Sequence, residues 1–71
     1  MLRIIVVEPF AHGWAVKQSS VDNSQVFTSG AKAEEAARRL GASLAGAGEA
    51  AEIQVYLRDG ALGGRFLCTA A

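Results

Sequence analysis

Residues 29–47 read SGAKAEEAARRLGASLAGA, and this stretch decides the fold because it alone has the periodicity of a long helix. Its apolar residues recur every three or four positions, and its charges lie on the opposite side. The apolar side consists of Ala33, Ala36, Ala37, Leu40 and Leu44, and the charged side of Glu34, Glu35, Arg38 and Arg39. Each glutamate precedes an arginine by four residues, which favours ion pairs along a helix. One helix with one apolar stripe covers one face of a sheet, so we expect an α+β fold.

The ends of this helix are also marked in the sequence. Thr28 or Ser29 can cap the first turn, because a hydroxyl oxygen accepts hydrogen bonds from the free N–H groups there. Gly46 or Gly48 should end the helix through a left-handed cap. Gly41 lies inside the helix, where glycine costs about 1 kcal/mol relative to alanine. Gly41 therefore either lets the helix approach the sheet closely or marks early fraying.

Three strands are predicted before the helix. Residues 2–7 are rich in β-branched side chains and form the first strand, which Pro9 should end because proline cannot donate to a sheet ladder. Residues 14–18 alternate between apolar and other side chains and form the second strand. The polar cluster at residues 19–24 suits a turn, and residues 25–28 form a brief third strand.

Two strands are predicted after the helix. Residues 52–58 alternate between the two faces of a sheet, and Asp59-Gly60 is the preferred pair for a two-residue hairpin turn. Residues 61–68 form the returning strand, in which Gly63 and Gly64 should place a bulge or a bend. We therefore expect a single domain, residues 1–71, with the order β-β-β-α-β-β. Its small antiparallel sheet of four to five strands packs on the one helix.

Chain length and net charge limit what this protein can bind and how stable it can be alone. A chain of 71 residues buries only about 60% of the surface that it exposes when unfolded, so association with a second copy is the usual source of extra stability. Seven Lys plus Arg balance seven Asp plus Glu, and the formal net charge is zero. The chain therefore has no long-range attraction for nucleic acid or for an anionic membrane.

The sequence also indicates a compartment. Cys68 is the only cysteine, which excludes an internal disulfide, and with His12 it cannot complete a zinc site. The apolar run at residues 4–7 is shorter than the hydrophobic region of a signal peptide and far shorter than the ~20 residues of a membrane span. We expect a cytoplasmic protein with no membrane partner.

No residue pattern predicts a catalytic, cofactor or metal site. His12 is the only imidazole, and no spacing links it to a nucleophile and an orienting carboxylate, so it is expected to be a solvated loop residue. Asp59 is explained by the hairpin turn that it forms with Gly60. No glycine cluster follows a strand and opens a helix, which a phosphate loop requires. We therefore expect no enzymatic activity and no cofactor.

Several short motifs carry a resemblance to a known family. They are residues 13–17 (GWAVK), 27–28 (FT), 33–38 (AEEAAR), 53–56 (IQVY) and 58–60 (RDG). Together they resemble the short bacterial proteins grouped as domain of unknown function 2188. That family brings no activity, cofactor or catalytic residue. Three strands followed by a helix that begins near a threonine are also similar to the antitoxin half of HicB-type toxin–antitoxin pairs.

The first strand is apolar on both faces, so one helix cannot cover all of its side chains. We assign to the helix-facing side Ile4, Val6, Trp14, Val16, Ile53, Val55 and Leu57, although the two faces of the first strand could be reversed. The uncovered remainder predicts a homodimer, formed either by packing of sheet faces or by pairing of edge strands. Its predicted interface residues are Ile5, Val7, Tyr56 and Leu67. The main functional hypothesis is a non-enzymatic module that associates with itself, and an additional protein partner is left open.

A second hypothesis is a nucleic-acid-binding or antitoxin-like regulator. Aromatic and basic side chains on one sheet face are how several small domains hold single-stranded nucleic acid. Here the candidate residues on the face away from the helix are Lys17, Tyr56, Arg58 and Arg65. The zero net charge and the lack of a basic cluster make an ordinary mixed sheet face the default interpretation.

Overall fold

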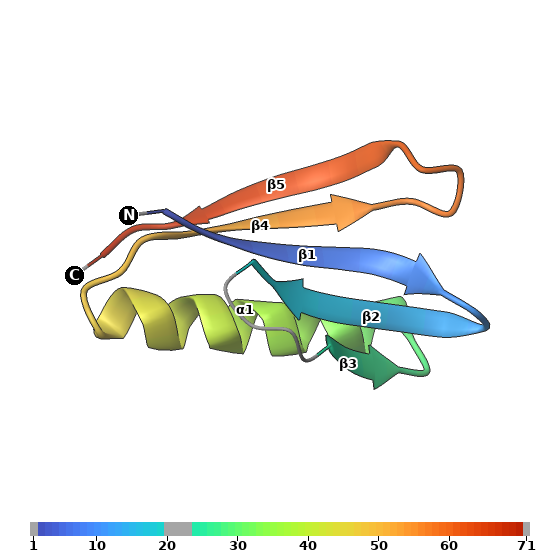
Figure 1. The fold of residues 1–71 in the computed structure, drawn as a ribbon, viewed down its shortest axis with the longest axis horizontal. Helices are drawn as coiled ribbons and strands as arrows, with labels where there is room; N and C mark the ends of the chain where they lie inside the picture. The colour runs from blue at the N-terminus through green and yellow to red at the C-terminus, as the bar shows by residue number, and fades with distance from the viewer. Residues whose placement is uncertain (1, 20–23, 71) are drawn as a thin grey trace.

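The computed structural model describes residues 2–19 and 24–70, within which the chain forms five strands and one helix (Figure 1). The elements are β1 Arg3–Phe10, β2 Gly13–Gln18, β3 Ser24–Phe27, α1 Gly30–Gly46, β4 Ala51–Tyr56 and β5 Leu62–Cys68. The predicted α+β class and the order β-β-β-α-β-β are confirmed. Part of the predicted polar turn, residues 20–23, lies outside the described residues.

The strands form one sheet in the order β3-β2-β1-β4-β5, and α1 packs against one of its faces. All neighbouring strands are antiparallel except β1 and β4, which are parallel. The sheet is therefore mixed, whereas the sequence predicted an antiparallel one. The cause is the helix: its 17 residues rise about 25 Å and return the chain to the end of the sheet where β3 began, so β4 points the same way as β1.

Both ends of α1 are capped by the residues expected from the sequence. The Ser29 hydroxyl accepts a hydrogen bond of 3.1 Å from the N–H of Lys32, which satisfies one donor of the first turn. At the other end Gly48 has a φ of +88°, and the N–H of Glu49 donates to the carbonyl of Leu44 at 2.9 Å. This is the hydrogen bond of a Schellman cap, for which glycine has the required backbone freedom.

The helix meets the sheet through its smallest residues. Ala33, Ala37 and Gly41 follow one another at four-residue intervals and are all buried. A Cβ atom at Gly41 would lie 2.8 Å from the sulfur of Cys68 and 3.4 Å from a terminal methyl of Ile53. Gly41 therefore marks close approach of α1 to β4 and β5, and the alternative of early fraying is wrong because the helix continues to Gly46.

The side of β1 that faces the helix is the opposite of the one we assigned. Ile5 and Val7 are 0% and 1% exposed and lie in the core beneath α1. The register of the sheet causes this, because Val7 pairs with Val16 and so shares its helix-facing side. Ile4 and Val6 consequently point to the other face. The prediction that Ile5 and Val7 form a dimer interface is wrong, since neither can reach a second chain.

The remaining residues assigned to the helix side divide into two groups. Val16 and Ile53 are buried in the core, and Trp14 and Val55 pack against it, as expected. Leu57 is different, because β4 has already ended at Tyr56. Its side chain lies over Gly63, where an added Cβ would be 2.7 Å from a Leu57 methyl, and it remains 47% exposed.

The strand β1 runs through Pro9 to Phe10, although the sequence predicted that Pro9 ends it. The N–H of Arg3 donates to the carbonyl of Ala50, so the N–H groups of odd-numbered β1 residues point toward β4. The ladder with β4 ends at Val7. The N–H that Pro9 lacks would therefore have met no partner, and the proline is tolerated in the strand.

The hairpin between β4 and β5 has a three-residue loop, residues 58–60, where the sequence predicted two. The N–H of Leu57 donates to the carbonyl of Ala61 at 2.8 Å, and the Asp59 carboxylate accepts the N–H of Ala61 at 2.9 Å. Gly60 has a φ of +88°, whereas Asp59 has none of the positive φ that a two-residue type I′ turn requires. Asp59 thus lies in the turn, and it stabilises the loop through its carboxylate, whereas the sequence predicted an effect of backbone geometry alone.

The close contact at Gly41 gives a prediction about stability. Gly41→Ala should lower the free energy of unfolding by about 1 kcal/mol, because overpacking against Cys68 outweighs the gain in helix propensity. In a Cys68→Ala background the same substitution should become neutral or stabilising. Urea denaturation of the four chains measures both effects.

Gly46→Ala provides the matched control, because nothing lies within 4 Å of a Cβ at Gly46. That substitution should be neutral or stabilising in both backgrounds. If Gly41→Ala raises the stability of the native sequence as much as Gly46→Ala does, the close approach of α1 to the sheet is wrong.

Candidate functional site

The face of the sheet that points away from α1, called the outer face below, is covered by none of the described elements. Side chains alternate along each strand, and the register fixes which of them share this face. Its members are Ile4, Val6, Glu8 and Phe10 of β1, Ala15 and Lys17 of β2, Ser24 and Val26 of β3, Glu52, Gln54 and Tyr56 of β4, and Leu62, Arg65 and Leu67 of β5. The outer face is thus a mixture of apolar and charged residues.

Most of the exposed large apolar side chains lie on this face, at its two edges and at the ends of β1. Leu67, Val26 and Leu62 are 62%, 58% and 46% exposed. Leu2 and Phe10 are 45% and 53% exposed and continue the same alternation at the two ends of β1. Among the described residues these five belong to a set of six exposed large apolar side chains, and the sixth lies in the β4–β5 connection. Exposed apolar side chains on an uncovered sheet face are a feature that interaction sites share.

A chain of hydrogen bonds runs along β4 and on to β5 across the outer face. The Tyr56 hydroxyl donates to the side-chain carbonyl of Gln54 at 3.1 Å, and the Gln54 amide donates to the Glu52 carboxylate at 2.7 Å. The other carboxylate oxygen of Glu52 accepts a hydrogen bond of 2.9 Å from the Arg65 guanidinium. Arg65 chiefly, with help from Gln54, holds the pKa of Glu52 below its ordinary value, and Glu52 raises the pKa of Arg65 in return.

A second ion pair lies on the other side of the outer face. The Lys17 ammonium is 2.7 Å from the Glu8 carboxylate, which joins β2 to β1. Ile4 and Val6 lie on the central strand β1. The Lys17–Glu8 pair joins this strand to β2, and the Glu52–Arg65 pair joins β4 to β5. Two acids and two bases therefore balance each other on the outer face, and each is bonded to its opposite charge within the chain.

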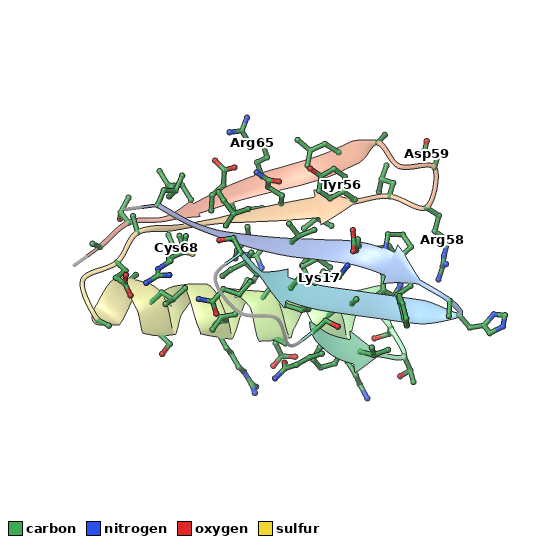
Figure 2. The ribbon with its side chains drawn as sticks, in the orientation of Figure 1. Lys17, Tyr56, Arg58, Asp59, Arg65 and Cys68 are labelled. Atoms are coloured by element: carbon green, nitrogen blue, oxygen red, sulfur yellow. The ribbon has the colours of Figure 1, made fainter. Side chains whose placement is uncertain are left out.

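The residues of the nucleic-acid hypothesis are divided by the structure. Lys17, Tyr56 and Arg65 lie on the outer face, but both cations are already bound to carboxylates. Arg58 lies in the β4–β5 connection, and its guanidinium is 5.3 Å from the centre of the Trp14 ring on the helix side. In Figure 2 Arg58 extends from that connection while Arg65 points away from α1. The described residues offer no cluster of unpaired cations on this face.

Of the four residues predicted for a dimer interface, two lie where an interface could use them. Tyr56 and Leu67 are on the outer face. Ile5 and Val7 are in the core, as described above, and their neighbours Ile4 and Val6 occupy the outer face instead. Sequence periodicity could not identify these two, because β1 is apolar on both sides.

Other reactive side chains are dispersed. His12 lies exposed in the turn between β1 and β2, and Cys68 lies on the α1 side of the sheet beside Gly41 (Figure 2). The described residues contain no group of three or more His, Cys, Asp or Glu side chains that could hold a metal ion.

A groove that the sequence did not predict lies between β3 and α1. It has a volume of about 570 Å³ and is open to solvent. Its lining combines apolar side chains with two amides and one guanidinium, namely Val16, Gln18, Gln25, Phe27, Ala36, Arg39 and Leu40. Arg39 is bonded to Glu35 at 2.6 Å, so the charge at the rim of the groove is balanced.

Comparison with known proteins finds no matching family model, no curated relative and no similar solved structure. The resemblance to the domain of unknown function 2188 and to HicB-type antitoxins therefore stays a prediction. In the part of the chain that the structure describes, no helix has the length and apolar character needed to cross a membrane.

The pairing of Glu52 with Arg65 predicts a pH-dependent contribution to stability. A carboxyl whose pKa is lower in the folded than in the unfolded chain stabilises the fold above its unfolded pKa, and this contribution is lost as the pH falls through the folded pKa. Wild type should therefore have a higher Tm than Glu52→Gln at pH 7, and the difference should shrink by pH 3.

Arg65→Gln is the control for this experiment, because Glu52 then has no guanidinium to stabilise its charge. In that background the Glu52→Gln substitution should change the Tm much less at either pH. A Tm difference that is the same at pH 3 and pH 7 would contradict the role assigned to the pair. Circular dichroism melting curves provide the measurement.

Proposed function

We propose that this protein acts by association rather than by catalysis, as a homodimer in which the outer face is the contact surface. The observation that carries the proposal is that most of the exposed large apolar side chains of the described residues lie on that face, with Leu67 62% exposed on one edge strand and Val26 58% exposed on the other. Burial of such surface against a second chain removes it from water, which is the main favourable term in protein association. Leu62 of β5 also lies on the outer face and adds to this exposed apolar surface.

The size of the outer face supports this proposal. The molecule is 35 Å long and 21 Å across, and the strands run along the long axis (Figure 1). Five strands about 4.8 Å apart and about 20 Å long present a flat area of ~500 Å². Side chains that stand on this area bring its accessible surface toward the ~800 Å² per partner of a standard interface.

The charge balance of the outer face favours a second copy over a strongly charged partner. A two-fold interface brings the same surface together twice, so a face of one sign would repel itself. Here the pairs of Glu8 with Lys17 and of Glu52 with Arg65 leave the face neutral. Nucleic acid gains little from such a face, because its binding depends on cations that neutralise phosphates.

We also propose a cytoplasmic location. The lone thiol, Cys68, lies against the backbone of α1 and has no second cysteine to pair with in the sequence. A reducing compartment suits such a residue.

Sedimentation over a range of concentrations tests the proposed function. Wild type should sediment as a dimer at high micromolar concentration, and Leu67→Ser should weaken dimerisation by at least tenfold, because a polar side chain replaces the most exposed apolar one on the outer face. Folding should be nearly unchanged, since Leu67 contributes little to the core of its own chain.

Leu57→Ser is the matched control, because Leu57 is also exposed but lies in the β4–β5 connection off the outer face. It should leave dimerisation within a factor of two of wild type. A monomer at high micromolar concentration would exclude the proposal. A salt-dependent mobility shift with single-stranded RNA or DNA, lost in Tyr56→Ala, would favour the nucleic-acid hypothesis instead.

A further inference from the structure

The sheet ends on one side in a long strand, β5, whose backbone has unused hydrogen-bonding groups. β5 forms the edge opposite β3, and none of the described elements lies beyond it (Figure 1). An edge strand presents unpaired N–H and C=O groups, to which a strand of another chain can add. β3 has only four residues, whereas β5 has seven. β5 is therefore the longer template for strand addition.

The ladders of the sheet identify the backbone groups on the free side of β5. The N–H of Arg3 donates to the carbonyl of Ala50, so β4 turns the backbone groups of its odd-numbered residues toward β5. The partners of those residues in β5 are the even-numbered positions of residues 64–68. Arg65 and Leu67 consequently direct their N–H and C=O groups away from the sheet. None of the described residues bonds to these groups.

Natural proteins usually block such an edge, and β5 lacks the blocking features along most of its length. Its sequence, LGGRFLC, holds neither proline nor lysine. Its one charge, on Arg65, is bonded at 2.9 Å to Glu52 over its own sheet. The shift in pairing with β4 lies between Val55 and Tyr56, at the start of β5, and leaves residues 64–68 in an uninterrupted ladder. This straight part is free to pair with a second strand.

The edge of β5 is complementary to itself. Antiparallel pairing of one edge with its own copy is a two-fold contact, the commonest symmetry of soluble oligomers. Three registers bring the free groups of Arg65 and Leu67 onto free groups of a second copy. Placing Arg65 opposite its own copy sets two like charges against each other, which destabilises a strand pair. Placing Leu67 opposite its own copy requires Thr69 as a bonding partner, and Thr69 lies outside β5.

The third register uses all the free groups of these two residues. Arg65 pairs with Leu67 of the second copy, Leu67 pairs with Arg65, and Phe66 lies at the two-fold axis. The stem of Arg65 then covers Leu67 of the second copy, which is 62% exposed in the single chain. The Phe66 ring lies on the α1 side, 4.4 Å from the Arg38 guanidinium, and meets its own copy there. Aromatic pairs directly opposite across two strands are favourable.

We infer that the β5 strands of two copies pair antiparallel about a two-fold axis at Phe66, which joins two five-stranded sheets into one. This contact goes beyond the proposed function, because it uses the edge of the sheet and leaves the outer face uncovered. α1 packs mainly against β1, β2 and β4, so the helices of the two copies stay apart. A chain that uses both contacts assembles beyond a dimer.

Hydrogen exchange of the wild-type chain, followed by NMR at micromolar and at millimolar concentration, tests this contact. The amides of Arg65 and Leu67 should exchange at least tenfold more slowly at the higher concentration, because each then donates to the second copy. The amide of Phe66 bonds to β4 and should be protected at both concentrations. Val26 is the matched control on the other edge, because its partner Ala15 bonds toward β1. Its amide should exchange rapidly at both concentrations.

A synthetic chain with a methyl group on the amide nitrogen of Leu67 provides a second test, because it blocks the edge and keeps every side chain. The fold should be unchanged by circular dichroism, since this nitrogen donates to none of the described residues. Sedimentation should show a smaller assembly than wild type at the same concentration. The same modification at Val26 should leave the assembly unchanged. The exchange experiment needs no altered chain and decides the question if the methylated chain fails to fold.

The outcomes separate this inference from the proposed function. If the exchange of Arg65 and Leu67 is the same at both concentrations, or if the methylated chain assembles as wild type does, the edge contact is overturned and an outer-face dimer can stand. If exchange slows and the chain methylated at Leu67 is a monomer, the edge contact stands and the proposed function is overturned. Both stand if wild type assembles beyond a dimer and the methylated chain stops at a dimer.

Discussion

The structure depends on the contact between a helix of small residues and one face of a five-stranded sheet. Ala33, Ala37 and Gly41 let α1 approach the sheet closely, and a single methyl group added at Gly41 would collide with Cys68. Close approach places Ile5 and Ile53 at the centre of the core with no exposure to solvent. A core built largely from alanine and glycine on one side buries little area per residue, so the domain depends on tight packing.

The same contact leaves the second face of the sheet without cover. The described residues form one helix, α1, and it packs against the opposite face of the sheet. Two ion pairs and the hydrogen-bonded row that ends at Tyr56 place polar groups on the outer face. Leu67 and Val26, on the two edge strands, remain largely exposed. Association through this face would supply the apolar burial that a chain of 71 residues gains only in part by itself.

Much of the architecture could be predicted from local signals. The helix and its caps at Ser29 and Gly48 follow from side-chain chemistry and backbone freedom that act within a few residues. The side of β1 that meets the helix could not be predicted, because Ile4 and Val6 are as apolar as Ile5. That choice depends on register with strands far away in sequence, as does the parallel pairing of β1 with β4.

Some residues of the candidate site could be predicted from the sequence, but their contacts could not. Tyr56 and Leu67 could be placed on the outer face because side chains alternate between the two faces along β4 and β5, and a short loop joins these two strands. The carboxylate partners of Lys17 and Arg65 could not be predicted from the sequence. Lys17 meets Glu8 across a hairpin, and Arg65 meets Glu52 diagonally on neighbouring strands. Nor does periodicity reveal the groove between β3 and α1, which arises from the meeting of two elements.

Isotope-filtered nuclear Overhauser spectroscopy on a mixture of labelled and unlabelled chains most directly tests whether a second copy covers the outer face. Contacts between chains should appear for the methyl groups of Ile4 and Val6, which lie on that face, and not for those of Ile5, which is sealed beneath α1. A millimolar sample with no contact between chains at either outer-face methyl group would contradict the central claim and leave the sheet with one face in water.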